Sequence, residues 1–591
     1  MPESSKKQII YTNKAQCRDC YRCVRACPVK AIKMFDAQAS VDVDRCILCG
    51  TCITECPQGA KQYRKDIILA KEYLESGQKV LLSLAPSFPA FFDDSVVSRV
   101  PSALRSLGFS FISETAIGAY LVSKEAEKYI KKHENRPHII SFCPVVVNFV
   151  EKYYPYLSNF LLPVKSPMIA HARYLKEKHG YDCKVVFIGP CIAKKDESQR
   201  DLYEGYVDAV LTFDELKEWF EEKEIDLRKF EESWFDEPCD DDAKLFALSG
   251  GFGKIANMPA DPISITNITT SGYESIKQAL SYLTPDKHVV IDSLFCNMGC
   301  INGAGIKNEV NFFERQQRVV KYAQKKDSFL PKAVTNYTIE SDLGAKFNRY
   351  SVNPKKEITE EQIKEVLQKT GKFNPEDELN CGACGYNTCH EKAIAVIEGI
   401  AEIEMCIPFM RRLAEQRGDK IIESSPNGIV ILDKELNIVN MNPAFKRFFY
   451  CNNSMFGKKI SVLMDPVHFE ELKAGEEDII ERTVNHEKYN IVCHQKLYKL
   501  KNENQLVGIF VDITKNLADK EQLNSLRNET VQQAQELLHH QIEMAQKLAK
   551  ILGENTAKGE ILVENLLRLA KDEQIKDKKS SNWLWDIYTS K

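Results

Sequence analysis

A cysteine run that occurs twice near the start of the chain constrains the fold more than any other feature. The pattern Cys-x2-Cys-x2-Cys-x3-Cys-Pro spans residues 17–28 and returns at residues 46–57. Thiolates at such spacings are ligands of iron–sulfur clusters. The alternative, a pair of zinc knuckles, does not account for the trailing Cys-Pro of both runs. The repeat therefore predicts a module built around two iron–sulfur clusters.

Length and composition set wider limits. At 591 residues the chain is too long for one core, and about 150 residues per domain suggests four or so domains. Its 20 cysteines and a start without an apolar signal core favour metal binding in a reducing, cytoplasmic compartment. The formal charge of -4 argues against a nucleic-acid partner, and no run approaches the ~18 apolar residues of a membrane span.

The repeat resembles that of two-cluster ferredoxins, in which the fourth cysteine of each run ligates the cluster of the other run. The resemblance implies one [4Fe-4S] cluster on Cys17, Cys20, Cys23 and Cys56. It implies a second on Cys46, Cys49, Cys52 and Cys27. Such a module, expected over residues 1–78, passes single electrons.

Three further cysteine loops lie between residues 140 and 305. They read Ser-Phe-Cys-Pro at 141–144, Gly-Pro-Cys-Ile-Ala-Lys at 189–194 and Phe-Cys-Asn-Met-Gly-Cys at 295–300. These loops resemble the signature loops of [FeFe]-hydrogenases, whose active site joins a cubane through one cysteine to a two-iron centre. The resemblance implies that Cys300 bridges to this subcluster. It also implies four thiolate ligands of the cubane: Cys143, Cys191, Cys296 and Cys300.

Short apolar runs alternate with helical stretches around these loops. Residues 80–85 and 185–189 are bounded by Gly or Pro, as expected of buried parallel strands in an α/β domain. Functional sites in open α/β sheets lie at the carboxyl ends of strands, which suits loops in these positions. The hydrogenase-like domain is expected over residues 79–345.

Departures from the family pattern imply slow turnover. Phe142 stands where active hydrogenases carry a cysteine that shuttles protons, and phenylalanine has no titratable proton. Three other positions differ from the usual methionine, glutamate and methionine: Gly189, Asp292 and Leu294. Lys194, whose family counterpart hydrogen-bonds a cyanide of the two-iron centre, and Glu197 are kept, so the candidate catalytic residues are Lys194, Glu197 and Cys300. A domain that keeps only the cubane stays an alternative.

A fourth cysteine set falls in residues 346–415. Glycines interleave Cys381, Cys384 and Cys389 and let the backbone wrap a metal site, and a helical, alanine-rich spacer leads to Cys406. The pattern resembles a small four-cysteine [4Fe-4S] domain of electron-transfer and corrinoid proteins. Zinc is the alternative, because four cysteines also complete its tetrahedral shell.

The next segment carries no cluster motif. Residues 421–445, with a closing strand near residues 507–514, resemble a PAS domain, which is expected over residues 416–515. Three histidines are conceivable haem or flavin ligands: His468, His486 and His494. Exposed or otherwise satisfied histidines in a ligand-free domain are the favoured interpretation.

The last segment, residues 516–591, is helical by composition. A narrow apolar stripe over residues 516–574 suits a dimeric coiled coil. The pair His539-His540 suggests the phosphoacceptor helix of a kinase, but no glycine-rich ATP-binding domain follows, which argues against it.

These features predict a multidomain protein of mixed α/β and α+β class. It would combine a ferredoxin-like module, an α/β hydrogenase-type domain, a small helical Fe–S domain, a PAS domain and a C-terminal α-helix or coiled coil. The expected cofactors are four [4Fe-4S] clusters, with a two-iron H-cluster subsite if it is inserted.

The order of the modules predicts a sensor of hydrogen or redox state. The PAS domain and helix would pass the change to a cytoplasmic kinase or phosphatase. A ferredoxin-type redox partner and a homodimer are expected, without nucleic acid or membrane. Two alternatives stay open: a ferredoxin-linked [FeFe]-hydrogenase that oxidises or evolves hydrogen, and an electron-transfer scaffold with cubanes only.

Overall fold

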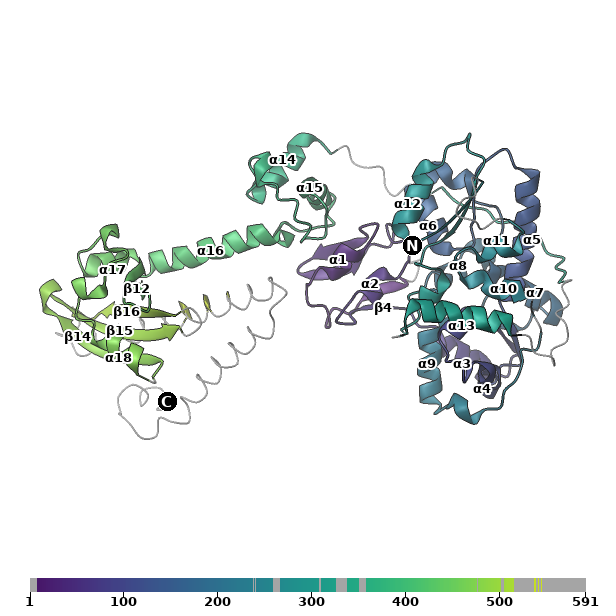
Figure 1. The fold of residues 1–591 in the computed structure, drawn as a ribbon, viewed down its shortest axis with the longest axis horizontal. Coiled ribbons are helices and arrows are strands. Elements are labelled where there is room, and N and C mark those ends of the chain that lie inside the picture. Colours follow the sequence, from purple (N-terminus) through teal and green to yellow (C-terminus); the bar gives the residue numbers. More distant parts are fainter. Residues whose placement is uncertain are drawn as a thin grey trace, which may run out of the picture. The chain divides into compact units, whose positions relative to one another are not determined.

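The structure is a computed structural model that describes residues 8–237, 239, 241–258, 266–307, 310–325, 337–349, 358–475, 477–500, 504–514, 536–537, 540–541 and 544. It divides into two compact units, Met1–Ile403 and Glu404–Lys591, whose elements are labelled in Figure 1. The predicted dimerising helix over residues 516–574, with His539, lies outside the described residues apart from the few positions named above. Within the described ranges, no helix is long and apolar enough to cross a membrane.

The cysteine repeat folds into an N-terminal module, residues 8–66. β1 (Ile10–Thr12) pairs with β4 (Lys61–Tyr63), and β2 (Ile32–Phe35) pairs with β3 (Gln38–Val41), both antiparallel. The short helices α1 (Arg22–Ala26) and α2 (Thr51–Thr54) begin inside the two cysteine runs and contact each other. A left-handed residue, Tyr21 or Gly50, precedes each helix and turns the chain sharply between successive cysteines. Each half of the repeat is thus a strand, a helix and a strand.

The central domain contains two parallel sheets. One has the order β6 (Phe111–Glu114), β5 (Val80–Leu84), β8 (Lys184–Gly189) and β9 (Ala209–Thr212). The other has the order β10 (Asn267–Ser271), β11 (Val290–Leu294) and β7 (His138–Ile139). All residues of β5 and β11 are buried, as expected of parallel strands covered on both faces. The predicted α/β class and both predicted parallel strands are confirmed.

Helices connect and cover these strands. The apolar core runs between the four-stranded sheet and helices such as α5 (Ala116–Lys132) and α7 (Pro167–His179), which contact each other. Two α-helices of this domain start with a proline, whose fixed φ suits the first helical residue: α6 (Pro144–Tyr153) directly after Cys143 and α7 directly after Ser166. The helices of the domain are α3 (Ile67–Glu75), α4 (Val100–Ser106), α5 (Ala116–Lys132), α6 (Pro144–Tyr153), α7 (Pro167–His179), α8 (Lys194–Glu197), α9 (Phe213–Glu222), α10 (Asp241–Lys244), α11 (Gly251–Ile255), α12 (Tyr273–Tyr282) and α13 (Phe312–Gln324).

A small module, residues 358–403, ends the first unit. Its helices α14 (Glu360–Lys369) and α15 (Cys389–Ile397) pack through Ile363, Val366 and Ala393. A reciprocal pair of hydrogen bonds between Thr359 and Gln362 caps α14. The apolar contact between α14 and α15 fixes both helices beside the loop that carries Cys381 and Cys384.

The second unit contains one helix followed by a five-stranded antiparallel sheet. α16 (Ile407–Ser424) precedes a sheet of order β13 (Ile438–Met441), β12 (Gly428–Leu432), β16 (Gln505–Asp512), β15 (Ile491–Leu500) and β14 (Ile479–His486). The helices α17 (Pro443–Phe448) and α18 (Val467–Ala474) cover one face, with Phe445, Phe469 and Phe510 in the core. The predicted closing strand near residues 507–514 is β16.

Candidate iron–sulfur centres

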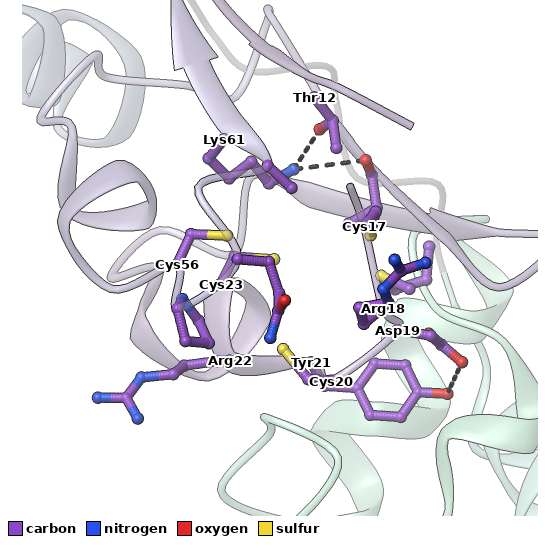
Figure 2. A pocket seen from close by; sticks show the side chains of 15 residues that line it. Thr12, Cys17, Arg18, Asp19, Cys20, Tyr21, Arg22, Cys23, Cys56 and Lys61 are labelled. Carbon is purple, nitrogen blue, oxygen red and sulfur yellow. Dashed lines mark hydrogen bonds between the residues drawn. The ribbon is translucent and has the colours of Figure 1, made fainter. Parts of the chain in front are cut away.

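The first predicted ligand set surrounds one pocket of the N-terminal module. Cys17, Cys20, Cys23 and Cys56 line it together with Lys61. Figure 2 shows the sulfurs of Cys20, Cys23 and Cys56 turned toward the same space. Burial raises the pKa of Cys23 to about 11; the Lys61 ammonium opposes this rise, and thiolate charge at Cys20, Cys17 and Cys56 adds to it. The fold thus brings the last cysteine of the second run to the first three of the first run.

The other four cysteines of the repeat form a reciprocal set, Cys46, Cys49, Cys52 and Cys27. Burial raises the pKa of Cys46 to about 12, and the thiolate charges of Cys49 and Cys27 contribute to the rise. Burial also raises the pKa of Cys52, with further contributions from Cys49, Cys46 and Cys27. Cys27 of the first run therefore lies within electrostatic range of the first three cysteines of the second run.

Lys61 lies between these two sets. Its ammonium group donates to the Thr12 hydroxyl at 2.6 Å and to the Ala39 carbonyl at 3.4 Å, and its residue is only 3% exposed. The same charge opposes the raised pKa of both Cys23 and Cys52. A buried cation at this place stabilises negative charge on either thiol set.

The three loops of the central domain bring four more thiols together. Cys143 precedes α6, Cys191 follows β8, and Cys296 follows β11, so each loop leaves the carboxyl end of a parallel strand. Burial raises the pKa of Cys191 to about 12; the Cys143 thiolate adds to the rise and Lys194 opposes it. Burial and the thiolates of Cys143 and Cys191 likewise raise the pKa of Cys300.

This central set adjoins the Cys46 set. Burial raises the pKa of Cys296, and thiolate charge acts on it from Cys191, Cys300 and Cys143 and also from Cys49 of the N-terminal module. Gly50 has a φ of +78°, and a Cβ there would lie 2.3 Å from the Cβ of Ala304. Glycine is therefore required for this close approach of the two cysteine-bearing segments.

Lys194 and Glu197 form a buried pair beside the central thiols. The Lys194 ammonium lies 2.6 Å from a Glu197 carboxylate oxygen, which also accepts a hydrogen bond of 3.0 Å from the Ser166 hydroxyl. The ammonium group also lies 3.5 Å from the Phe142 carbonyl oxygen. These contacts join the first and second loops, and they hold the ammonium within electrostatic range of Cys191 and Cys300.

Phe142 is 4% exposed and sits in an aromatic cluster. Its ring centroid lies 5.7 Å from that of Phe246 and 5.6 Å from that of Phe252. Three packed rings present no group that can carry a proton. The position expected to relay protons is thus occupied by apolar packing.

Gly189 and Leu294, two of the departures from the family pattern, lie in closely packed surroundings. A Cβ on Gly189 would lie 2.6 Å from the Phe187 ring and 3.0 Å from the Cβ of Ala85, so a methionine does not fit here. Leu294 is buried at the end of β11. Asp292, on the same strand, is 4% exposed and its Oδ2 has no hydrogen-bond partner in the described part of the chain.

Sequence reasoning missed a buried ionic cluster that joins the N-terminal module to the second loop. Lys195 is fully buried, and its ammonium lies 2.9 Å from the Glu215 carboxylate and 3.6 Å from that of Asp66. Glu215 also accepts hydrogen bonds from the backbone N–H groups of Asp66 and Thr212. In the sequence this cluster is marked only by a second lysine beside Lys194. A solvent-exposed lysine at the same position would look identical.

The small module gathers three of its four predicted ligands around one loop. Cys381 and Cys384 alternate with Gly382 and Gly385, both with positive φ, and Cys389 opens α15. The backbone N–H of Cys389 donates to Asn380 Oδ1 at 2.7 Å. Cys406 is buried at the start of α16, in the second unit, so its place in this set rests on the sequence spacing.

Zinc and a cubane place different demands on the four thiolates that bind them. Zinc draws four thiolates to about 2.3 Å from one ion. In a cubane each cysteine binds a different iron, so the thiolates stay farther apart. In the described ranges, no group of three or more His, Cys, Asp or Glu side chains is placed to hold a single metal ion. The iron–sulfur assignment of the three sets in the N-terminal module and central domain rests on their cysteine spacing.

The PAS histidines are spread over three elements. His468 Nδ1 lies 3.2 Å from Glu471, and His494 Nδ1 lies 3.3 Å from the Thr483 hydroxyl. The His486 ring packs edge-on against Phe449 at 5.1 Å, and burial lowers the pKa of its imidazole. These are the contacts of ordinary surface and core histidines.

Four family models match the chain. They are described as a 4Fe-4S dicluster domain over residues 9–58, the C-terminal domain of the iron only hydrogenase large subunit over residues 78–304, a putative Fe-S cluster over residues 377–408, and a PAS domain over residues 419–483.

The chain is also similar, over part of its length, to a hydrogenase and to an Fe-S cluster assembly factor. Iron hydrogenase 1 of Clostridium pasteurianum is 27% identical over 45% of this chain and 64% of its own length. The cytosolic Fe-S cluster assembly factor NAR1 of Yarrowia lipolytica is 28% identical over 32% of this chain and 45% of its own. The chain thus spans less than two thirds of either relative.

A solved structure of a variant of [FeFe]-hydrogenase HydA1 from Chlamydomonas reinhardtii is 19% identical, covering 44% of this chain and 89% of its own, with a TM-score of 0.37. Three of the four family models cover the segments that carry the cysteine sets, and the fourth covers the PAS segment. One chain thus joins segments that match a 4Fe-4S dicluster domain, the C-terminal domain of the iron only hydrogenase large subunit, a putative Fe-S cluster domain and a PAS domain.

Proposed function

We propose that the protein senses hydrogen or redox state and does not serve as a fast hydrogenase. The observation that carries this proposal is the packing of Phe142 between Phe246 and Phe252 beside otherwise complete cysteine loops. A positioned proton relay typically contributes about 10²–10⁴-fold to a rate. A site that keeps its cluster ligands but lacks this relay suits slow exchange with hydrogen, which is sufficient for detection.

The proposed cofactors are four [4Fe-4S] clusters, held by four groups of cysteines. The groups are Cys17, Cys20, Cys23 and Cys56; Cys46, Cys49, Cys52 and Cys27; Cys143, Cys191, Cys296 and Cys300; and Cys381, Cys384, Cys389 and Cys406. A two-iron subsite, where inserted, would supply hydrogen binding, and each cubane would take up one electron. Lys194 would orient toward that subsite, Glu197 and Ser166 would hold Lys194 in place, and Cys300 would bridge the two parts.

The proposed output is a protein contact. The proposed domains span residues 1–78, 79–345, 346–415, 416–515 and 516–591. In this order the cluster-binding domains that sense the signal would precede the PAS domain and helix that transmit it. The PAS domain supports a signalling interaction, and we assign it to a cytoplasmic kinase or phosphatase, with a ferredoxin-type protein as redox partner. Residues 516–574 would make the homodimer, because a helix with a narrow apolar stripe is marginal without a packing partner.

An infrared spectrum of the anaerobically matured protein, measured together with its hydrogen-evolution rate, tests this proposal. CO and cyanide bands with slow turnover are the expected result. Bands with rapid turnover would favour the ferredoxin-linked enzyme instead.

One observation favours a second candidate, an electron-transfer scaffold with cubanes only. The chain resembles NAR1, whose name describes a cytosolic Fe-S cluster assembly factor. Absence of CO and cyanide bands from matured protein, with the iron of four cubanes present, would support this candidate.

A further inference from the structure

The small module docks on the N-terminal module through several backbone contacts. Met34 N–H donates to the Ile400 carbonyl at 2.9 Å, and Asp36 N–H donates to the Glu402 carboxylate at 2.7 Å. Both contacts lie along the hairpin of β2 and β3. They fix the end of the small module against this hairpin.

A second group of contacts lies at α1. The Arg25 guanidinium donates to the Ala383 carbonyl at 3.1 Å and to the Cys20 carbonyl at 3.0 Å. Gly385 has a φ of +95°, and a Cβ there would lie 2.9 Å from Val24 Cγ1 and 3.1 Å from the Arg25 nitrogen. The cysteine loop of the small module therefore presses its backbone directly onto α1, and only glycine permits this.

Lys30 occupies the junction between the two modules. Its ammonium donates to the Val24 and Arg25 carbonyls at 3.2 and 3.3 Å, at the carboxyl end of α1, and lies 5.9 Å from the centre of the Tyr386 ring. Tyr386 is 5% exposed. Burial lowers the pKa of Lys30, and the charges of Cys27, Glu391 and Cys384 oppose that lowering. The Lys30 backbone N–H donates to the Cys27 carbonyl at 3.3 Å, and Tyr386 lies two residues after Cys384, so Lys30 lies between the cysteine segments of the two modules.

The same arrangement recurs at the other junction of cysteine sets in the N-terminal module. Lys61 is a buried cation between Cys23 and Cys52. A lysine between two thiolate-rich sites stabilises added negative charge on both. It also reduces the repulsion between charges held on the two sites.

We infer that Lys30 is a positioning residue shared by the Cys27 and Cys384 ligand sets, and that its ammonium group couples the small module to the Cys46 set. The Cys46 set also adjoins the central site, because Gly50, next to Cys49, lies directly against Ala304 of the third loop. It would therefore be the branch point between the hydrogenase-like site and the small module. This inference rests on the proposed function for its biological meaning, but its test is independent of any signal output.

Potentiometric titration of the full-length reconstituted chain, followed by electron paramagnetic resonance, tests the inference. Cys17→Ser, Cys49→Ser and Cys384→Ser variants identify the signal of each set. Lys30→Gln should move the midpoint potentials of the Cys49 and Cys384 signals to more negative values and leave the Cys17 signal in place. Lys30→Arg, which keeps the charge, should retain the parental potentials.

Lys33→Gln is the matched control, because it removes the same charge from an ammonium group paired with Asp42 at 2.9 Å. It should leave all three signals unchanged. A Lys30→Gln shift confined to one signal, or one matched by Lys33→Gln, would overturn the inference.

A Gly385→Leu variant tests the docking separately, since the added side chain meets Val24. Amide hydrogen exchange should rise both at residues 381–402 and at residues 22–36. Unchanged exchange in these segments would refute the docked arrangement. Lys30→Gln could shift the potentials of the Cys49 and Cys384 signals in a protein whose PAS domain does not respond to the redox state. In that case the role of Lys30 is supported and the sensor proposal fails.

Discussion

The Lys195 ammonium lies 2.9 Å from the Glu215 carboxylate, and neither side chain reaches solvent. This pair links the second cysteine loop to α9, and Glu215 also receives the backbone of Asp66 from the segment that leaves the N-terminal module. The ion pair therefore fixes the segment that leaves the N-terminal module in its position relative to the central site.

Replacing Lys195 by methionine should destabilise the first unit strongly. Removal of one partner leaves the Glu215 charge buried without its counter-ion, which typically costs about 3–5 kcal/mol. Denaturant unfolding of this variant and a control measures the change. Lys217→Met is the control, because Lys217 is 60% exposed and lies 3.9 Å from Glu221; such surface changes are usually within about 0.5 kcal/mol. Equal stabilities of the two variants would contradict the assigned role.

Iron analysis should return about 16 irons per chain, or about 18 with a two-iron centre, since each cubane holds four irons. Cys384→Ser should lower this content by up to about four irons. Cys183→Ser is the control, because Cys183 is buried against the Gly180 carbonyl outside every motif. A parental total near eight would refute the assignment of four clusters.

Phe142→Cys in matured protein should raise hydrogen evolution, by up to about 10²–10⁴-fold if the rest of the proton route is intact. Phe142→Ala opens the same space between Phe246 and Phe252 without adding a thiol. Hydrogen evolution from both variants separates proton relay from simple loosening of the site. The same increase in the alanine variant, or a parental rate that is already high, would contradict the role given to Phe142.

Stability should depend on pH through Asp292. Burial raises the pKa of this carboxyl to about 7, from about 3.9 in an unfolded chain. The folded state then binds the proton more tightly, so the stabilising effect is complete below about pH 4 and declines as the pH rises toward 7. The slope is at most about 1.4 kcal/mol per pH unit.

Thermal unfolding under anaerobic conditions between about pH 5.5 and pH 8 measures this slope. Asp292→Asn should flatten the curve over this range. Asp286→Asn should not, because hydrogen bonding from Thr284 lowers the pKa of that exposed carboxyl and keeps it ionised throughout. Parallel curves for the parent and Asp292→Asn would contradict the prediction.

The sequence was informative where chemistry fixes local spacing. Cysteines that bind one cluster recur within a few residues, and apolar runs such as residues 80–84 mark buried strands. The two-residue strand β7 and the separation of the strands into two sheets gave no such signal, because strand pairing depends on partners far apart in the chain.

Residues that join modules were not predictable in this way. Lys30 meets Tyr386, and Lys61 meets Thr12 across the repeat, through contacts between distant positions. The sequence does not distinguish a buried lysine from an exposed one, because burial depends on the fold. The cysteine spacing thus located the sets, while their electrostatic surroundings became visible in the structure.

The most direct test of the sensor proposal is amide hydrogen exchange in the PAS domain, residues 428–512, with the clusters oxidised or reduced by hydrogen or dithionite. Electron paramagnetic resonance on the same samples verifies the redox state. We predict that exchange of the PAS sheet changes when the clusters are reduced. Identical exchange in both states, with reduction verified, would contradict the proposal that this protein transmits redox state to its PAS domain.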